Sequence, residues 1–393
     1  MRTSALAFAS ALSCLAAAQF QWEQLPDFLG TARDDAAAFS IDCDVYVGTG
    51  MQVGWSLTND FWRYDSFSQT WSPSTTLPAS PRQYCTAQSL FSQGYLFGGL
   101  DASGPLSELW SFDPGSQSWI QRASLPGAGR YACGSFVLAN SLYICGGIIA
   151  GGTALNELWK YDPFTDSWEQ RSSLPGVGRH RMATAEGGFV AGGADSSYAP
   201  LDECWQYNSF GDQWASLPAL PEGRFGGSGA SWLSGILFVA GAIDNATFRA
   251  SAFHYTGAGW ELSEAALPSE RRGGVVAVSG CAGGWNFLNY GLGLDGTMAR
   301  RNDWFGTSFA FSIGEQSPSS FSVIPNPATE AIRLPEGMSY NEAIIINAQG
   351  VVVVRISEHR GLTLPVHHLS AGAYLLRLRL NEGFSTARFI KLP

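Results

Sequence analysis

Six arginines occupy equivalent positions along this chain and are the residues best placed to do chemistry. Each follows a Leu-Pro connection and precedes an apolar run; they are Arg33, Arg82, Arg130, Arg179, Arg224 and Arg271. Arginine presents a fixed fork of N–H donors that suits carboxylates and acidic sugars. Gathered at one place, the six would bind an anionic ligand. A structural role is the favoured interpretation and does not exclude ligand binding, because buried arginines need acidic partners, and each repeat supplies an acid such as Asp60, Glu108, Glu157 or Glu203.

Aromatic and basic residues lie one or two positions after these arginines and would complete a site for a sugar or a carboxylate: Tyr84, Tyr131, His180, Arg181, Phe225 and Arg272. We therefore predict a ligand-binding site made of the six arginines with Tyr84, Tyr131, His180 and Phe225. Catalysis would need a positioned proton donor or acceptor. Only His180 and the repeated acids offer one, so the residues favour binding over catalysis.

Other familiar catalytic sets are missing from the sequence. We find no nucleophile elbow, phosphate loop or HExxH motif. His180 and His254 are the only histidines before residue 313, and they lie in different repeats at different positions. We expect no cofactor, no metal and no catalytic residue.

The elements that must position these arginines come from a repeat. Six tryptophans recur 46 to 49 residues apart: Trp22, Trp71, Trp119, Trp168, Trp214 and Trp260. Each copy carries an apolar run ending in glycines, then an acid before an aromatic residue, then the tryptophan. Short apolar runs separated by turn residues indicate β-strands, and a period near 50 indicates a repeat architecture.

The diglycines, the acid–aromatic pairs and the spaced tryptophans together resemble the kelch repeat. The resemblance implies a β-propeller of four-stranded blades, in which the aromatics fill the space between blades. Six blades are expected, because the third-strand aromatic occurs six times, as Trp62, Trp110, Trp159, Trp205, Phe253 and Trp304. Propeller symmetry then places the six arginines at one mouth of the central channel.

The order of elements at the two ends predicts how the ring closes. The chain begins in the fourth-strand position, with Trp22 before any diglycine, whereas the last repeat has Trp304 but no closing tryptophan. We expect residues 20–24 to form the outermost strand of the last blade, which removes an open sheet edge. The propeller is assigned to residues 19–313.

The first 18 residues predict export. Arg2, an apolar run through Leu15 and a final alanine triplet are typical of a secretory signal peptide, cleaved before Gln19. A lipoprotein signal at Cys14 is the alternative. No other window is long and apolar enough to cross a bilayer.

Export makes disulfides permissible for the six remaining cysteines. They include no close CxxC pair, which disfavours a zinc site. Cys133 and Cys145 flank a turn and could pair, although buried free thiols are the favoured interpretation.

Residues 314–320 predict a linker, and residues 321–393 a second all-β domain. Its landmarks run in order: Pro325-Asn326-Pro327, Asn347 to Val351, Leu369 to Tyr374 and the terminal Phe389-Ile390-Lys391. They closely resemble the C-terminal sorting domain of the bacterial type IX (Por) secretion system. The resemblance implies a small Ig-like β-sandwich, engagement of the type IX secretion machinery, and a protein that is secreted or held at the outer-membrane surface. A β-sandwich adhesion module is the alternative.

Composition agrees with an exported β-protein and excludes one class of partner. The chain has 23 basic and 33 acidic residues, for a net charge of -10, so nucleic-acid binding is not expected.

These observations predict a secreted or cell-surface binding module for a glycan or protein ligand. Recognition would use the mouth and the loops after the diglycines, such as residues 100–107, 148–155 and 194–201. The alternative is a non-metal sugar mutarotase or epimerase, since the chain also resembles the six-bladed sialic acid mutarotase, which handles an anionic sugar.

Overall fold

A computed structural model of the chain describes residues 21–232, 235–263, 266–281, 285–308, 323–335, 338, 340–347, 352–356, 361–380 and 383–392. The predicted signal peptide and the predicted linker lie outside these residues. The described residues contain strands and turns and no helix. They divide into two compact units, one with strands β1 to β30 and one with strands β31 to β36.

The third sheet shows how one repeat folds. It contains β14 (Gly134–Leu138), β15 (Ser141–Cys145), β16 (Leu158–Asp162) and β17 (Ser167–Arg171), each antiparallel to the next. Gly146 and Gly147 follow β15 with φ of 64° and 95°. This left-handed backbone suits glycine, and a Cβ on Gly146 would lie 2.5 Å from the Arg179 carbonyl oxygen. The diglycine therefore lets the chain pass close to the next repeat.

The described residues of the first unit form six such four-stranded sheets. The first contains β3 (Ala37–Ile41), β4 (Asp44–Gly48), β6 (Phe61–Asp65) and β7 (Thr70–Pro73). The second contains β8 (Thr86–Leu90), β9 (Gln93–Phe97), β12 (Leu109–Asp113) and β13 (Ser118–Arg122). The fourth contains β18 (Ala183–Ala185), β19 (Phe189–Ala191), β20 (Cys204–Asn208) and β21 (Gln213–Leu217). The fifth contains β22 (Ser228–Trp232), β23 (Gly235–Val239), β24 (Ala252–Tyr255) and β25 (Trp260–Ser263).

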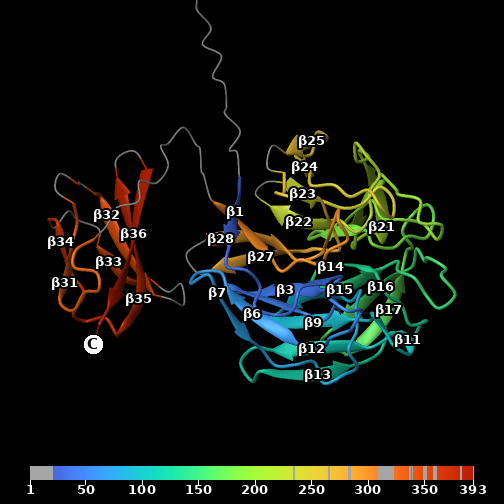
Figure 1. Cartoon of the computed structure of the whole chain (residues 1–393), viewed down its shortest axis with the longest axis horizontal. Coiled ribbons are helices and arrows are strands. Elements are labelled where there is room, and N and C mark those ends of the chain that lie inside the picture. Colours follow the sequence, from blue (N-terminus) through green and yellow to red (C-terminus); the bar gives the residue numbers. More distant parts are fainter. Residues whose placement is uncertain are drawn as a thin grey trace, which may run out of the picture. The chain divides into compact units, whose positions relative to one another are not determined.

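The sixth sheet combines the two ends of the repeat region. It contains β27 (Val275–Cys281), β28 (Trp285–Gly291), β30 (Trp304–Ser308) and β1 (Gln21–Leu25). Strand β1 pairs antiparallel with β30, with Trp22 opposite Thr307 and Leu25 opposite Trp304. Figure 1 shows the blue β1 beside the orange strands of this sheet. The predicted closure by an N-terminal strand is confirmed.

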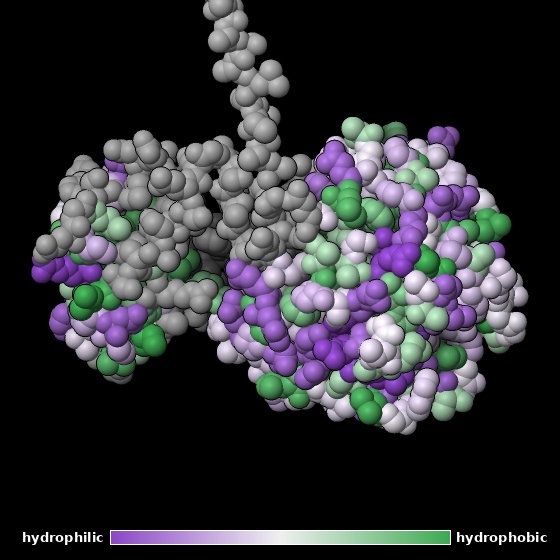
Figure 2. All heavy atoms as spheres, turned by 45° about the horizontal axis from the view of Figure 1, so that its top comes forward, coloured by the Kyte–Doolittle hydropathy of each residue, from purple (hydrophilic) through white to green (hydrophobic). Residues whose placement is uncertain are grey.

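The innermost strands form a closed cycle. Contacts run from β3 to β8, β14, β18, β22, β27 and back to β3, so the unit is a β-propeller. Short two-stranded ladders lie in the connections: β2 (Arg33–Asp34) with β5 (Met51–Gln52), β10 (Leu100–Asp101) with β11 (Gly104–Pro105), and β26 (Arg271–Arg272) with β29 (Leu294–Asp295). In Figure 2, hydrophilic and hydrophobic residues are intermixed over the visible face of the propeller.

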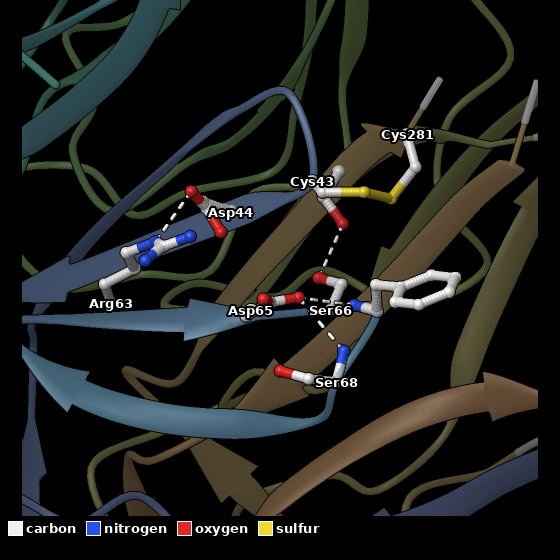
Figure 3. The surroundings of a disulfide bond; sticks show 9 residues. Cys43, Asp44, Arg63, Asp65, Ser66, Ser68 and Cys281 are labelled. Atoms are coloured by element: carbon white, nitrogen blue, oxygen red, sulfur yellow. Dashed lines mark hydrogen bonds and ion pairs between the residues drawn. A yellow bond between two sulfur atoms is a disulfide. The ribbon is translucent and has the colours of Figure 1, made fainter. Parts of the chain in front are cut away.

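A disulfide joins the first and last sheets (Figure 3). Cys43, in the turn between β3 and β4, bonds to Cys281 at the end of β27, across 238 residues of sequence. The sequence did not predict this pair. Cys133 and Cys145 stay free, as favoured. Gly134 lies opposite Cys145 in the β14–β15 ladder, so the neighbouring Cys133 side chain is on the other face of the sheet.

The second unit has a four-stranded sheet of β33 (Val352–Ile356), β32 (Glu342–Asn347), β35 (Gly372–Leu380) and β36 (Gly383–Lys391). A small ladder pairs β31 (Ala331–Arg333) with β34 (Thr363–Pro365). Buried Ile332, Ile345, Leu364, Leu376 and Phe389 belong to one core of this unit. Across the described part of the whole chain, no helix has the length and apolarity to span a membrane.

Candidate functional site at the channel mouth

Each of the six arginines connects two neighbouring sheets, as Arg130 illustrates. Its backbone bonds to the connections of the second sheet: Arg130 N donates to Leu106 O at 2.9 Å, and Gly99 N donates to Arg130 O at 3.1 Å. Its side chain reaches the third sheet, where Nη2 donates to Glu157 Oε2 at 2.8 Å. Trp159 Nε1 donates to the same oxygen at 2.8 Å. Burial would raise the pKa of Glu157, but the bonds from Trp159 and Arg130 hold it below its usual value.

The same ion pair recurs around the ring. Arg33 pairs with Asp60 at 2.5 Å, Arg82 with Glu108 at 2.8 Å, Arg271 with Asp303 at 2.7 Å, and Arg179 with Glu203. The predicted partners Asp60, Glu108, Glu157 and Glu203 are therefore confirmed. Arg224 differs, because its Nε pairs with Glu222 at 3.0 Å and its Nη2 donates to Ser251 Oγ at 2.8 Å.

Burial removes these arginines from direct contact with solvent. Their side chains are at most 3% exposed. A buried arginine whose charge is already paired has little affinity left for a second anion, although Arg130 Nη1, Arg179 Nε and Arg271 Nε have no hydrogen-bond partner among the described residues. The residues that follow the arginines are the ones that reach the mouth of the channel.

Two residues after each arginine, the backbone forms a closed hydrogen-bonded ring, which we call the central ring. Its members are Asp35, Tyr84, Ala132, Arg181, Gly226 and Gly273. Each N–H donates to the carbonyl of the preceding member, and Asp35 N closes the cycle on Gly273 O, over distances of 2.8 to 3.0 Å. All six have positive φ, between 52° and 64°. Glycine is the residue that such a backbone favours.

Three members of the central ring carry large or charged side chains despite this backbone. Arg181 Nη2 donates to Tyr84 Oη at 2.6 Å, and the Arg181 guanidinium lies 4.5 Å from the centre of the Tyr84 ring. Asp35 is 9% exposed. Non-glycine residues held in left-handed conformations cluster at functional sites, so Asp35, Tyr84 and Arg181 stand out.

Two cavities lie along the channel axis. A cavity of about 100 Å³ is lined by all six members of the central ring, including Asp35, Tyr84 and Arg181. A second, of about 260 Å³, is lined by residues of the six innermost strands, from Ala36 near the ring to Glu186 at the far end of β18. We call the end that carries the central ring the channel mouth.

The other predicted site residues differ in their access to this mouth. Tyr131 is partly exposed, and its ring centre lies 5.7 Å from that of Tyr84. His180 and Phe225 are fully buried. His180 Nε2 bonds to Asp195 O at 3.1 Å, and burial, then the charge of Arg181, lower the His180 pKa to about 4. His180 is therefore neutral and enclosed at pH 7.

Sequence reasoning missed two acids and a tryptophan at this end. Asp34 Oδ1 accepts from Arg300 Nε at 2.5 Å, and burial, then the neighbouring Asp35, raise the Asp34 pKa to about 6. Trp55 is 77% exposed and its ring lies 4.7 Å from the Arg300 guanidinium. Asp35 could have been found from its position in the repeat, because it lies two residues after Arg33, as Arg181 lies two residues after Arg179.

Three exposed apolar side chains stand at matching points of the loops that follow the glycines. Trp55, Tyr198 and Met298 are 77%, 38% and 54% exposed, with φ of 63°, 64° and 66°. In the third sheet the same point is Gly152, with φ of 84°. We call these loops, with their large apolar residues at exposed positions, the rim.

Comparison with known proteins agrees with the fold. Residues 4–173 match the KLHDC2/KLHL20/DRC7 Kelch-repeats domain, and residues 322–392 match the secretion system C-terminal sorting domain, Por_Secre_tail. A solved structure described as "Structure of YjhT" is similar at a TM-score of 0.62 with 17% identity, over 73% of this chain and 98% of that one. None of the curated proteins matches the sequence. The chain thus has a kelch-repeat domain and a sorting domain for export by type IX secretion to the cell surface or beyond.

Proposed function

We propose that this exported kelch protein is an extracellular binding module that holds a glycan or protein ligand at the channel mouth. One observation carries the proposal: the central ring places Asp35, Tyr84 and Arg181 in conformations that glycine would favour. Gly226 and Gly273 occupy the same conformation in the same ring. A large side chain there costs on the order of 1 kcal/mol relative to glycine. Ligand contact gives a reason for keeping three such side chains that touch one cavity.

The rim supports a ligand larger than the 100 Å³ cavity. Trp55 and Tyr198 offer exposed aromatic surface on loops of the first and fourth sheets. Aromatic side chains dominate the energetics of recognition surfaces because they bury large areas at low entropic cost. The loop at residues 194–201, predicted from the sequence to recognise a partner, contains Tyr198.

Our proposal includes the finer architecture. We interpret the six sheets as the blades of a six-bladed propeller spanning residues 19–313, followed by a linker at 314–320 and an Ig-like sandwich at 321–393. The signal peptide would be residues 1–18. The closed cycle of contacts between innermost strands supports the blade number.

A mutarotase acting on an anionic sugar is the second candidate. Ring opening needs a group that gains and loses a proton near neutral pH, and Asp34, with its pKa raised to about 6, is such a group at the mouth. However, Asp34 is itself buried and paired with Arg300, and His180, the acid–base candidate from the sequence, is enclosed. We place binding first for that reason.

Ligand screening with matched variants tests the proposal. Arg181→Ala and Tyr84→Ala should keep the fold, because Ala132 already occupies a ring position at φ 54°. Wild-type protein and the double variant are compared on arrays of glycans and on extracted cell-surface proteins. Loss of the wild-type ligands in the double variant supports the mouth as the site; retention of all of them contradicts it. Accelerated anomer exchange of sialic acid in NMR would establish catalysis instead.

A further inference from the structure

We infer that the channel mouth selects the hydroxyl groups of a neutral sugar rather than an anion. This inference rests on the proposed function and names the ligand class of the same site. It reverses the simplest interpretation of the arginines, which favoured an anionic ligand. Two observations support the neutral ligand. The repeated arginines are paired with carboxylates, and buried polar atoms at the cavity have no hydrogen-bond partner among the described residues.

The charges of the six repeated arginines are neutralised before they reach the mouth. All six pair with a carboxylate. Arg300 pairs with Asp34, and Arg272 lies over the Phe248 ring, 5.1 Å from its centre. The charged groups lining the cavity at the central ring are then one acid, Asp35, and one base, Arg181. An anion entering that cavity would meet a carboxylate as well as a guanidinium.

Asp35 and Arg181 approach the cavity from opposite sides. Asp35 precedes β3 and Arg181 precedes β18, three steps apart in the cycle of six innermost strands. Within the part of the chain that the structure describes, the two residues form no ion pair with each other. Each has buried atoms without a hydrogen-bond partner there: Asp35 Oδ2, and Arg181 Nε and Nη1. Orphaned buried polar atoms are costly, by about 1–3 kcal/mol each. A bridging group would satisfy both.

The chemistry of these orphaned atoms restricts that bridging group. Arg181 offers only donors and an ionised Asp35 offers only acceptors. The bridging group must accept from one and donate to the other. A carboxylate cannot donate to Asp35 and an ammonium cannot accept from Arg181, whereas a hydroxyl does both. The 100 Å³ cavity has room for about three groups the size of a water molecule, enough for the hydroxyl edge of a sugar.

Aromatic surface completes a sugar site. Tyr131 lies beside Tyr84 and is partly exposed, so it can pack against the C–H face of a pyranose. Charged partners make stronger hydrogen bonds to hydroxyls than neutral ones do. One acid, Asp35, and one base, Arg181, on the same cavity therefore give affinity for hydroxyls without a net charge.

Matched sugars that differ only at C6 provide the test. We titrate the full mature protein with glucose and glucuronate, and with galactose and galacturonate, and follow binding by saturation-transfer NMR and calorimetry. The neutral member of at least one pair should bind at least tenfold more tightly than its uronate. Asp35→Ala and Arg181→Ala should each weaken that binding at least tenfold. Glu186→Gln, an acid lining the far end of the larger cavity, is the matched control and should bind like wild type.

Thermal melting first establishes that each variant is folded. If an alanine variant does not fold, Tyr84→Phe, which removes only the hydroxyl bonded to Arg181, takes its place. Uronates bound more tightly than neutral sugars, with binding lost in Arg181→Ala, would overturn the inference and leave the proposed function standing. Neutral sugars bound equally by wild type and both alanine variants would overturn it as well. If none of the four sugars binds, the inference is overturned. The proposed function is overturned as well only if the ligands found on the arrays bind the mouth variants as tightly as they bind wild type.

Discussion

Trp71 donates its indole N–H to the carbonyl oxygen of Pro26 at 3.0 Å. The bond ties the first sheet to the segment that follows β1 in the sixth. The next four sheets repeat it: Trp119 bonds to Thr75 O, Trp168 to Ala123 O, Trp214 to Ser172 O and Trp260 to Pro218 O. The tryptophan period in the sequence is thus the period of a contact between neighbouring sheets, and Trp71 makes that contact where the ring closes.

Removing the N-terminal strand should destabilise the whole propeller. Without residues 20–26 of the mature chain, β30 loses its five paired residues and Trp71 loses its acceptor. We expect the melting temperature to fall by at least about 10 °C, which corresponds to several kcal/mol for a domain of this size. Calorimetry measures the fall, and Glu23→Ala, an exposed change within β1, should leave it within 1–2 °C, about what a neutral surface substitution allows. An unchanged melting temperature for the deletion would contradict the closure.

Features that repeat in every copy could be predicted from the sequence. Trp22 was assigned to the last sheet because it precedes the first glycine motif of the chain and the last repeat has no closing tryptophan of its own. The ion pairs of Arg82 and Arg130 followed from the rule that buried charge needs a partner. Both arguments use features that occur in several repeats, so one atypical repeat does not change the prediction.

Features that occur once were harder to predict. Cys43 and Cys281 lie at the hairpins between the first and second strands of the first and last sheets, and their closeness appears only once the ring is closed. The central ring depends on backbone conformation, and side-chain types do not reveal a positive φ at Tyr84 or Arg181. Asp35 was not predicted, because a site for an anionic ligand is expected to contain basic and aromatic residues rather than an acid.

Breaking one arginine pair should cost more than breaking a surface pair of similar geometry. Arg130→Met removes a buried cation and leaves the Glu157 carboxylate, which is 32% exposed, without its partner; we expect a loss of about 2 kcal/mol, below that for a fully buried pair. Arg63→Met is the control, because the Arg63 side chain in its 2.7 Å pair with Asp44 is 42% exposed; such pairs contribute at most about 1 kcal/mol. Urea denaturation measures both. Equal losses would show that Arg130 does not act as a buried link between sheets.

The disulfide should stabilise the propeller only under oxidising conditions. Cys43→Ser with Cys281→Ser opens a covalent loop of 238 residues, and we expect a loss of about 4 kcal/mol. Reductant should lower the denaturation midpoint of the wild type to that of the double variant and leave the variant unchanged. Burial raises the pKa of the Cys145 and Cys204 thiols to about 12, so alkylation of the folded protein followed by mass analysis should find them unmodified. Rapid alkylation of either would contradict their burial.

The pH dependence of stability should contain two opposing contributions from the mouth. The His180 pKa falls from 6.5 to about 4 on folding, so between these values the unfolded chain binds a proton that the folded chain does not. Its contribution to stability is present above pH 6.5 and declines by about 3 kcal/mol as the pH falls to 4. Asp34 has the opposite sign, because its pKa rises from 3.8 to about 6. Its contribution is present below pH 3.8 and is lost as the pH rises through 6.

Single variants should separate these two contributions, which nearly cancel in the wild type. His180→Phe removes the imidazole and its bond to Asp195 O, so the variant is less stable near neutral pH; relative to wild type, it should gain stability as the pH falls from 6.5 to 4.5. Asp34→Asn should show the reverse trend over the same interval, because only the His180 contribution remains. Urea midpoints measured at half-unit steps of pH give both slopes. Parallel pH profiles for His180→Phe and wild type would mean that His180 is protonated in the folded protein, and hence that solvent reaches it at the channel mouth.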